Sequence, residues 1–434
     1  MDTANYTVGF ARLDMTPPLG VDIPGSWNKK VGEGILDPLY VNAIAFGDGE
    51  KTAVILVMDL LGIYGPMMQW KDSIARDMGM DPESLLLCCT HSHTTPNVAR
   101  PEGDPFYDRW LYRRLCDAIT LSKKDLKSVT DVSAAEGRAE GLTFVRRFLM
   151  KDGTVITRPA QNLMDQILRP SDENDDSLRV VRFRRTEGKD IVIVNFQSHP
   201  DNIGGYLYSA DFPGIMRNEL ERVTENTYSI FINGAEGQMV TDNCALPRIP
   251  AGPEKARNHG LKLAAVAADL LKKAVPTKML GLSYGQRAVR LKTKRDPSRV
   301  PEARRIMELW NAGRKEEIHP SAKQANYLFA ESRQLLRLED NDRDYIDTNV
   351  VGIAFCGFAL AGIPGEPFNE IGKQIRSNSK FPITCVTCQA NASYGYFPTA
   401  KAHEEGGYES YNTPYVKGTA ELLADTADKL LASL

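Results

Sequence analysis

The sequence has few cysteines and lacks long apolar runs. Seven cysteines among 434 residues is a small and odd number, which argues against a disulfide framework and favours a reducing compartment. The first residues, Met1–Thr7, have neither the basic start nor the apolar stretch of a secretion signal. No segment reaches the ~18 to 20 unbroken apolar residues that span a bilayer. We therefore expect a cytoplasmic protein without a transmembrane segment.

The sequence also lacks a strong charge of either sign. Its formal net charge of -3 is too close to zero to indicate a polyanionic partner, so we expect no nucleic-acid binding. An apolar content of 42% and a charged content of 25% are ordinary for a soluble globular protein. Composition does not bear on the oligomeric state.

Apolar runs alternate with helical patterns along the whole chain, without repeats or a low-complexity linker. Strands are predicted at residues 41–46, 52–58, 85–90, 178–183, 191–196, 228–232, 282–291, 352–363 and 383–388. Helices are predicted at about residues 108–121, 253–273 and 414–431. The alternation is too irregular for a barrel, and it predicts an α/β fold with mixed β-sheets flanked by α-helices. Nothing marks a domain boundary, so we expect residues 1–434 to form a single domain.

The segment Pro301–Leu338 is more polar than its surroundings and carries several aromatic residues. Its pattern predicts a helical hairpin that is broken around His319-Pro320. We interpret residues from about 300 to 340 as a helical insertion over one edge of the core. The pattern is compatible with a lid over a site, or with a solvated hairpin that has no such role.

Histidine is scarce, and two of the six histidines lie close together. His91 and His93 follow the apolar run Leu85–Cys89. Side chains two residues apart point to the same face of a strand, so both imidazoles would project together from the end of a buried strand. This arrangement is typical of metal sites, although neutral histidines that are hydrogen-bonded near a core give the same pattern.

Other apolar runs end in residues of the same chemical type. His199 follows the run Ile191–Phe196, and Glu366 lies between two prolines after the run Gly357–Ile363. Open α/β sheets place their sites at such strand ends. A catalytic zinc site needs about three protein ligands from His and Asp/Glu and one open position. His91, His199 and Glu366 meet that requirement.

These residues lie in motifs that resemble those of the neutral and alkaline, non-lysosomal ceramidases. Residues 90–96 (Thr-His-Ser-His-Thr-Thr-Pro) are similar to the Thr-His-Thr-His-Ser-Gly-Pro motif of that family. Four further segments resemble family motifs in the same order: Val8–Pro18 at the start, Ser198–Pro200, Pro364–Phe368, and Gly395–Thr399 together with Gly407–Glu409. The resemblance runs from about Val8 to Tyr411. It implies layered mixed β-sheets flanked by helices around a single zinc ion.

Carried over motif by motif, the resemblance also implies roles for single residues. The zinc ligands would be His91, His199, Glu366 and Tyr396. His93 would face the substrate as a second histidine, and Tyr408 would be a supporting tyrosine. Arg146 would orient the substrate, with Arg147 as the less favoured choice.

The sequence departs from the family in one motif and at its end. The Gly-Asp-Val-Ser-Pro segment of the family stands here as Gly237–Thr241, so that Val240 replaces the serine. A mechanism that requires an attacking serine at this position is thereby excluded. The sequence stops soon after the catalytic motifs, where the family continues into a β-rich domain.

We therefore expect a zinc-dependent amidohydrolase that cleaves a small-molecule or lipid-like N-acyl amide. A zinc-activated water would attack the carbonyl carbon without a side-chain nucleophile. Tyr396 would stabilise the oxyanion, His93 would pass a proton to the leaving amine, and Arg146 would hold a polar or anionic group of the substrate. Two alternatives remain open: an esterase or hydrolase of small amides, and an inactive metal-bearing protein that binds an amphiphile or a sugar derivative.

Some further residues are expected to be structural. Asp211 is expected to orient His199 from behind, since metal-bound imidazoles usually donate to a carboxylate. His259, His319 and His403 are interpreted as surface histidines. The pair Cys385 and Cys388 is interpreted as strand packing, because no second pair completes a zinc knuckle.

Overall fold

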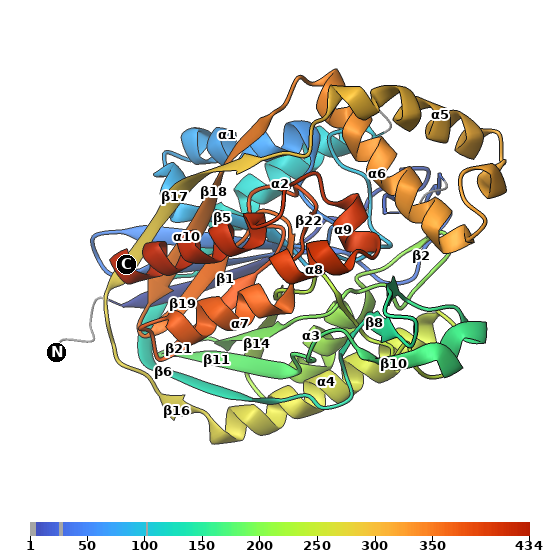
Figure 1. The fold of residues 1–434 in the computed structure, drawn as a ribbon. Coiled ribbons are helices and arrows are strands. Elements are labelled where there is room, and N and C mark those ends of the chain that lie inside the picture. The colour runs from blue at the N-terminus through green and yellow to red at the C-terminus, as the bar shows by residue number, and fades with distance from the viewer. Residues whose placement is uncertain (1–5, 26–28, 101–102) are drawn as a thin grey trace.

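The computed structural model describes residues 6–25, 29–100 and 103–434 (Figure 1). Eight strands of its main sheet follow one another in the order β14-β12-β11-β6-β1-β3-β4-β5, and β16 pairs with β6 at the side. In chain order these strands are β1 (Thr7–Asp14), β3 (Tyr40–Gly47), β4 (Thr52–Met58), β5 (Leu85–Cys89), β6 (Lys127–Arg138), β11 (Ser177–Arg185), β12 (Asp190–Phe196), β14 (Thr227–Asn233) and β16 (Val275–Pro276).

A second sheet packs face to face against the main one. Its order is β17-β18-β19-β21, and its strands are β17 (Leu282–Lys292), β18 (Tyr345–Phe355), β19 (Phe358–Gly362) and β21 (Ile383–Thr387). One hydrophobic cluster joins both sheets, with Ile55 and Phe46 of the main sheet and Phe355 and Leu360 of the second. Adjacent side chains of a strand point to opposite faces, so Val54 and Leu56 of β4 enter a different cluster on the outer face.

Helices cover the outer faces of both sheets, which gives a layered sandwich. On the main sheet, α1 (Trp70–Asp77) and α2 (Pro105–Lys124) pack over the half that holds β3 to β5, and α3 (Asp211–Val223) and α4 (Pro253–Lys273) over the half that holds β11 to β14. On the second sheet lie α7 (Asn369–Asn378) and α10 (Thr419–Ser433) (Figure 1). The predicted α/β class with mixed sheets flanked by helices is confirmed.

Three parallel strand pairs bring the ends of distant segments together. The pairs β4 with β5, β12 with β14, and β19 with β21 are parallel, whereas most of the other pairs are antiparallel. Because parallel strands share a direction, the loops that follow them leave the sheet at the same edge. The segments after β5, β12, β14 and β19 are the ones that carry His91, His199, Glu236 and Glu366.

The structure divides one of the predicted strands. Residues 352–363 form the end of β18 and all of β19, joined by a turn at Cys356 and Gly357, both of which have positive φ angles (50° and 84°). Two such residues in succession are typical of a tight hairpin turn. The sequence conceals the turn because both strands are buried on both faces, so the apolar run continues through it.

Short strands and helices lie around the edge of the sheets from which the loops after the parallel strands emerge, which we call the loop edge. They comprise β2 (Gly34–Ile35) with β13 (Leu207–Tyr208), β7 (Phe144–Val145) with β15 (Met239–Val240), β8 (Arg147–Met150) with β9 (Val155–Thr157) and β10 (Ile167–Pro170), β20 (Glu366–Pro367) with β22 (Tyr396–Phe397), and the helices α8 (Ala400–Glu405) and α9 (Tyr408–Asn412).

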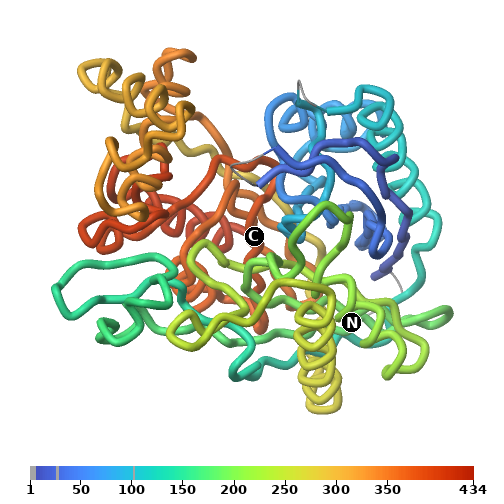
Figure 2. The backbone as a smooth tube through the Cα atoms, turned by 90° about the vertical axis from the view of Figure 1, so that its right-hand side faces the viewer, coloured from blue at the N-terminus to red at the C-terminus, as the bar shows by residue number. Residues whose placement is uncertain are grey.

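The segment predicted as a helical hairpin contains α5 (Val300–Asn311) and α6 (Ala322–Asp340). The break around His319-Pro320 lies between the two helices, where residues 312–321 leave the α-helical pattern. Figure 2 shows this hairpin, in orange, and the N-terminal part of the chain, in blue, standing on either side of the loop edge. Among the described residues, no helix is long and apolar enough to cross a membrane.

Candidate metal centre

Three side chains from distant parts of the chain meet at the loop edge. The Nε2 atoms of His91 and His199 lie 3.5 and 3.4 Å from the same oxygen, Oε2 of Glu366. The two imidazole rings are 4.9 Å apart between centroids and nearly perpendicular. The side chains of His91, His199 and Glu366 are at most 8% exposed. The structure thus brings together the three residues that the sequence predicts as ligands.

The spacing of these three atoms suits a bound cation. Zinc binds nitrogen and oxygen ligands at about 2.0 to 2.2 Å, so two ligands of a tetrahedral ion lie about 3.4 Å apart. The measured 3.4 and 3.5 Å agree with that value. Nε2 of His91 and Oε2 of Glu366 also have no hydrogen-bond partner within the described parts of the chain, although both are buried. The donor set therefore fits a metal ion.

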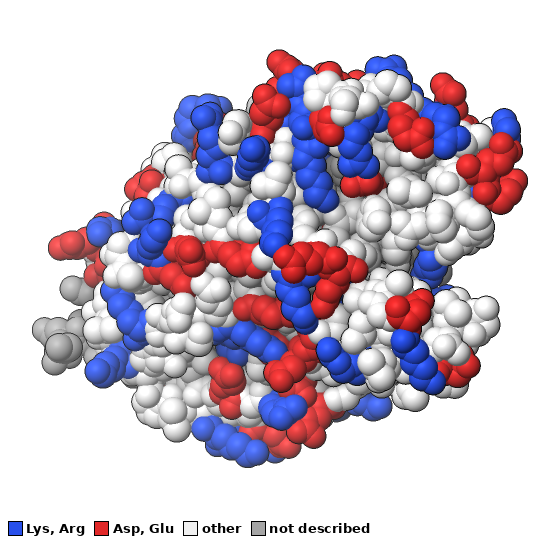
Figure 3. Space-filling view, viewed as in Figure 1, with Lys and Arg blue, Asp and Glu red and all other residues white. Residues whose placement is uncertain are grey.

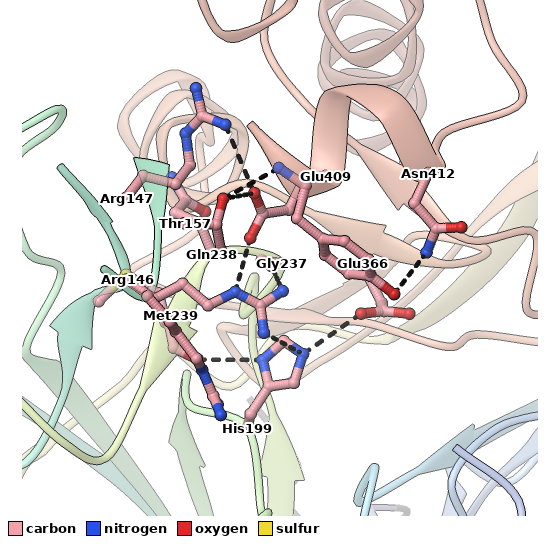
Figure 4. Close-up of polar contacts among 12 residues, drawn as sticks. Arg146, Arg147, Thr157, His199, Gly237, Gln238, Met239, Glu366, Glu409 and Asn412 are labelled. Atoms are coloured by element: carbon pink, nitrogen blue, oxygen red, sulfur yellow. Dashed lines mark hydrogen bonds and ion pairs between the residues drawn. The ribbon is translucent and has the colours of Figure 1, made fainter. Parts of the chain in front are cut away.

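Backbone carbonyls fix the orientation of both imidazoles. Nδ1 of His91 lies 2.6 Å from the carbonyl oxygen of Leu61, and Nδ1 of His199 lies 3.0 Å from that of Met239 (Figure 4). A carbonyl only accepts, so Nδ1 carries a proton in each ring and Nε2 is the atom that faces Glu366. His91 has a φ of 69°, a backbone conformation that is strained for a residue other than glycine.

Glu236 is a fourth acidic or basic side chain of this centre, which the sequence analysis missed. It is fully buried, and its Oε2 lies 3.3 Å from Nδ1 of His199. Its ligand-type oxygen, those of Glu366 and the nitrogens of His91 and His199 all lie within 4.8 Å of one another. The thiol of Cys388 donates a hydrogen bond to the carboxylate of Glu236. The position of Glu236 shortly after an apolar strand could have identified it, because His199 was predicted from the same kind of position.

Burial and the two carboxylates set the charges of the centre. Burial opposes protonation of His91, but Glu366 and Glu236 outweigh it and raise the His91 pKa to about 9. Burial lowers the His199 pKa to about 4, with a further contribution from Arg146. For Glu366, His91 outweighs burial and holds the carboxyl pKa well below its usual range. Burial raises the Glu236 pKa to about 8. The centre thus favours one positive charge, which a proton or a metal ion can supply.

The two candidate arginines have different surroundings. Nε of Arg146 donates to Glu409 at 2.6 Å, and its Nη1 lies 3.4 Å from Nε2 of His199 (Figure 4). Arg147 instead donates to the carbonyl oxygen of Gly406 at 2.7 Å and is fully buried away from the cavity. Of the two, Arg146 is the one that reaches the centre.

The remaining predicted residues surround the centre. Glu366 pairs in register with Tyr396 through β20 and β22, which brings Tyr396 beside the cluster. The Tyr396 ring lies 6.5 Å from that of His199 and 5.9 Å from that of Tyr408. Burial raises the Tyr396 pKa well above its usual value and the Tyr408 pKa to about 12, so both phenols remain protonated near neutral pH. The His93 ring lies 5.0 Å from that of His91.

The centre opens into a cavity of about 950 Å³. The predicted residues that line this cavity are His91, His93, Arg146, His199, Glu366, Tyr396 and Tyr408. Residues from the N-terminal part and from α6 form other parts of the wall. Val240 is buried and is not among the described lining residues, so the position that lacks the serine does not face the cavity.

Two structural expectations are wrong. Asp211 does not contact His199, because its carboxylate accepts the backbone N–H groups of Asn202 and Ile203, at 2.8 and 3.0 Å, and Glu236 takes the expected place. His259 is not a surface histidine: it is 7% exposed and packs edge-on against Phe212 at 4.6 Å. The apolar face of α4 extends one turn further toward its N-terminus than the pattern indicated.

The other structural expectations agree with the structure. His319 and His403 both reach the surface, where their side chains are partly exposed. Cys385 lies inside β21 and Cys388 follows it, and both are fully buried free thiols, as expected for strand packing.

Comparison of the chain with family models gives no match, and no curated protein matches it. Solved structures with a similar fold include two ceramidases. One is a neutral ceramidase from Pseudomonas aeruginosa, with a TM-score of 0.71 and 16% sequence identity over 99% of this chain and 75% of that one. The other is a ceramidase complexed with C2, with a TM-score of 0.72 and 14% identity over 99% of this chain and 76% of that one. The likeness shows a shared, ceramidase-like fold at low sequence identity.

Proposed function

We propose that this protein is a zinc-dependent hydrolase that cleaves an N-acyl amide. The observation that carries the proposal is the convergence of His91, His199 and Glu366 at tetrahedral ligand spacing on the wall of a large cavity. The shared fold supports amide hydrolysis, because the similar structures are named as ceramidases and ceramide is an N-acyl amide.

In this proposal His91, His199 and Glu366 hold the ion, and Tyr396 is the fourth donor. Two nitrogens and one carboxylate oxygen form a ligand set that is common in catalytic zinc sites. When bound there, zinc lowers the pKa of a water molecule to about 7 and polarises a carbonyl group. Glu236 supports His199 from behind, where its carboxyl group lies 3.3 Å from Nδ1 of the ring.

The cavity residues then have separate tasks in amide cleavage. Water oxygen adds to the carbonyl carbon, the C–N bond breaks, and the leaving amine takes up one proton. In this proposal His93 carries the proton, which is supported by its position on the cavity wall and by its buried Nε2, which has no partner among the described residues. The phenol of Tyr396, which also lines the cavity, donates to the developing oxyanion. Arg146, which Glu409 holds at 2.6 Å, orients a polar group of the substrate.

We also propose that the whole chain is one catalytic unit. Residues from Asp22 to Asn412 line the same cavity, so the site cannot be assigned to a smaller segment. The helical segment at about residues 300–340 is then an insertion that contributes one wall of the cavity through α6.

The test combines metal analysis with a substrate panel. Purified protein should contain one zinc ion per chain and should hydrolyse N-acyl amides in a reaction that a chelator stops and zinc restores. Glu366→Gln keeps the shape of the side chain but removes its charge, and it should lose both properties. Glu370→Gln makes the same chemical change in a residue that does not line the cavity and should keep both.

Three outcomes would replace the proposal. Chelator-sensitive hydrolysis of esters but not of amides would make the protein an esterase. Stoichiometric zinc without hydrolysis of any amide or ester would make it a binding protein. Hydrolysis that persists at full rate in Glu366→Gln would remove the metal from the mechanism.

A further inference from the structure

The wall of the cavity carries an excess of positive charge. Its described residues include seven lysines and arginines but only three carboxylates. Two of the carboxylates already face other groups of the cavity, because Asp201 pairs with Arg158 and Glu366 lies between the two imidazoles. Besides Arg146, the cations of the wall are Lys29, Arg100, Arg158, Lys323, Arg333 and Arg337.

Helix α6 supplies three of these cations from a single face. Its lining residues are Lys323, Asn326, Tyr327, Arg333, Gln334 and Arg337. At 3.6 residues per turn these positions fall within about one third of the helix circumference, so they form one stripe along the helix. Ten residues separate Lys323 from Arg333, which places them about 15 Å apart along the axis. The polar face of α6 therefore borders the cavity over much of its length.

Like charges crowd one end of this stripe. Arg333 and Arg337 lie one turn apart, and Arg100 approaches them from another part of the wall. Burial lowers the Arg333 pKa, and the neighbouring charges of Arg337 and Arg100 lower it further. Figure 3 shows the surface hollowed beneath the α5–α6 hairpin, on the right of the molecule. Gathering cations beside a cavity costs free energy, which a bound anion would offset.

The same wall offers little aliphatic surface. Ile23 and Leu61 are the large aliphatic side chains among its described residues, and its aromatic members are five tyrosines, each with a polar hydroxyl. Each methylene of an acyl chain gains about 0.8 kcal/mol only when apolar groups replace water around it. The described wall thus offers a long alkyl chain few aliphatic side chains to pack against.

We propose that the physiological substrate is a compact amide that carries an oxyanion, either a carboxylate or a phosphate, which Arg333 and Arg337 bind while the amide lies at the metal centre. This inference rests on the proposed function for its cleavage step, but the binding preference can be measured without turnover. Guanidinium groups bind carboxylate and phosphate through paired, charge-assisted hydrogen bonds, which are stronger than the hydrogen bonds that they form with a neutral isostere.

The test uses substrate pairs that differ only in the anion. One pair is an N-acetyl amino acid and its primary amide, and the other is an N-acetyl amino sugar with and without a 6-phosphate. With zinc-loaded protein, the charged member of at least one pair should have a kcat/KM about 100-fold above that of its neutral partner. The preference should weaken as salt is raised, because salt screens charges at an open cavity.

A double variant, Arg333→Met with Arg337→Met, should lower kcat/KM for the charged member by about 10- to 100-fold and leave the neutral member within about twofold. Arg290→Met, which removes an exposed cation of β17 outside the cavity, is the matched control and should change neither. The fold of each variant is checked by its unfolding midpoint.

A binding measurement separates the two proposals. Glu366→Gln protein, which should not turn over, is titrated with both members of each pair in a calorimeter. Tighter binding of the charged member by tenfold or more supports the substrate class, even if no amide is ever cleaved and the proposed function fails. Equal binding of both members, or a preference that survives in the double arginine variant, overturns the substrate class even if the wild-type protein hydrolyses neutral amides.

Discussion

Replacing Glu236 by glutamine should weaken zinc binding without removing it. The carboxylate of Glu236 lies 3.3 Å from Nδ1 of His199, while Nε2 of the same ring faces the metal centre. Changing a partner behind a metal ligand typically costs 10- to 100-fold in affinity, which is about 1.4 to 2.7 kcal/mol. The carbonyl oxygen of Met239 still accepts from Nδ1 at 3.0 Å, so the ring should keep its orientation.

The loss of zinc affinity can be measured through its effect on thermal or urea unfolding. At a zinc concentration of 100 times its Kd, the wild-type protein should gain about 2.7 kcal/mol of unfolding free energy. At the same zinc concentration, a variant with 10- to 100-fold weaker binding should gain only about 1.4 to 0.4 kcal/mol. Competition with a coloured chelator gives Kd directly and provides the second measurement.

Glu370→Gln is the control for this experiment. It also converts a largely buried glutamate to glutamine, but Glu370 faces Gln238 and Asp172 rather than the metal centre. The unfolding free energy that Glu370→Gln protein gains on adding zinc should equal that of the wild type. A Kd of Glu236→Gln within twofold of the wild-type value would refute the argument that this carboxylate supports the ion through His199.

Three further predictions concern stability, pH and catalysis. Arg217→Met should destabilise the protein by about 3 to 5 kcal/mol in urea unfolding, because it leaves Asp59 as a buried charge. Arg290→Met removes a solvent-exposed pair and should leave the unfolding midpoint close to that of the wild type, so equal effects of the two changes would contradict the burial argument. Burial and Asp172 raise the pKa of Glu370 to about 7, above its ordinary 4.5, so the stability that this group contributes is complete below about pH 4.5 and is lost as the pH rises to about 7. Glu370→Gln should therefore be more stable than the wild type at pH 7.5, by at most about 3 kcal/mol, and equal to it at pH 4.5, and a difference of the same size at both pH values would remove the charge as its cause. Tyr396→Phe should lower kcat by about 10²- to 10³-fold and keep stoichiometric zinc at saturating metal, and an unchanged kcat would exclude the phenol as an oxyanion donor.

The sequence identified most of the metal centre because single strands and their ends are local features. His91, His199 and Glu366 each follow an apolar run, and a buried strand is recognisable from such a run without knowledge of its partners. The motifs around them also resembled those of one family. Glu236 follows the same rule after β14, but an acid in a glycine-rich turn is common enough that its position alone did not distinguish it.

The contacts behind the centre were not predictable in the same way. Asp211 and Glu236 are both acids near strand ends, and nothing in the sequence states which of them lies behind His199. The choice depends on backbone geometry: Asp211 begins α3 with a positive φ of 53° and turns its carboxylate onto the backbone of Asn202 and Ile203. The turn at Cys356 and Gly357 was hidden for another reason, because packing on both faces of β18 and β19 removes the periodic signal. The burial of His259 was missed because this polar residue lies on the apolar face of α4.

The sequence by itself determined the class of the fold, the chemical type of the candidate ligands and the segments that carry them, because hydrophobic period and side-chain chemistry are properties of the chain. The tertiary structure alone decided that Glu236 joins His91 and His199, that Asp211 does not, and that the polar face of α6 borders the cavity. These outcomes depend on parallel pairing and on packing between residues hundreds of positions apart. A local pattern carries no record of such distances, whereas the assembled sheets bring those residues to within a few ångströms.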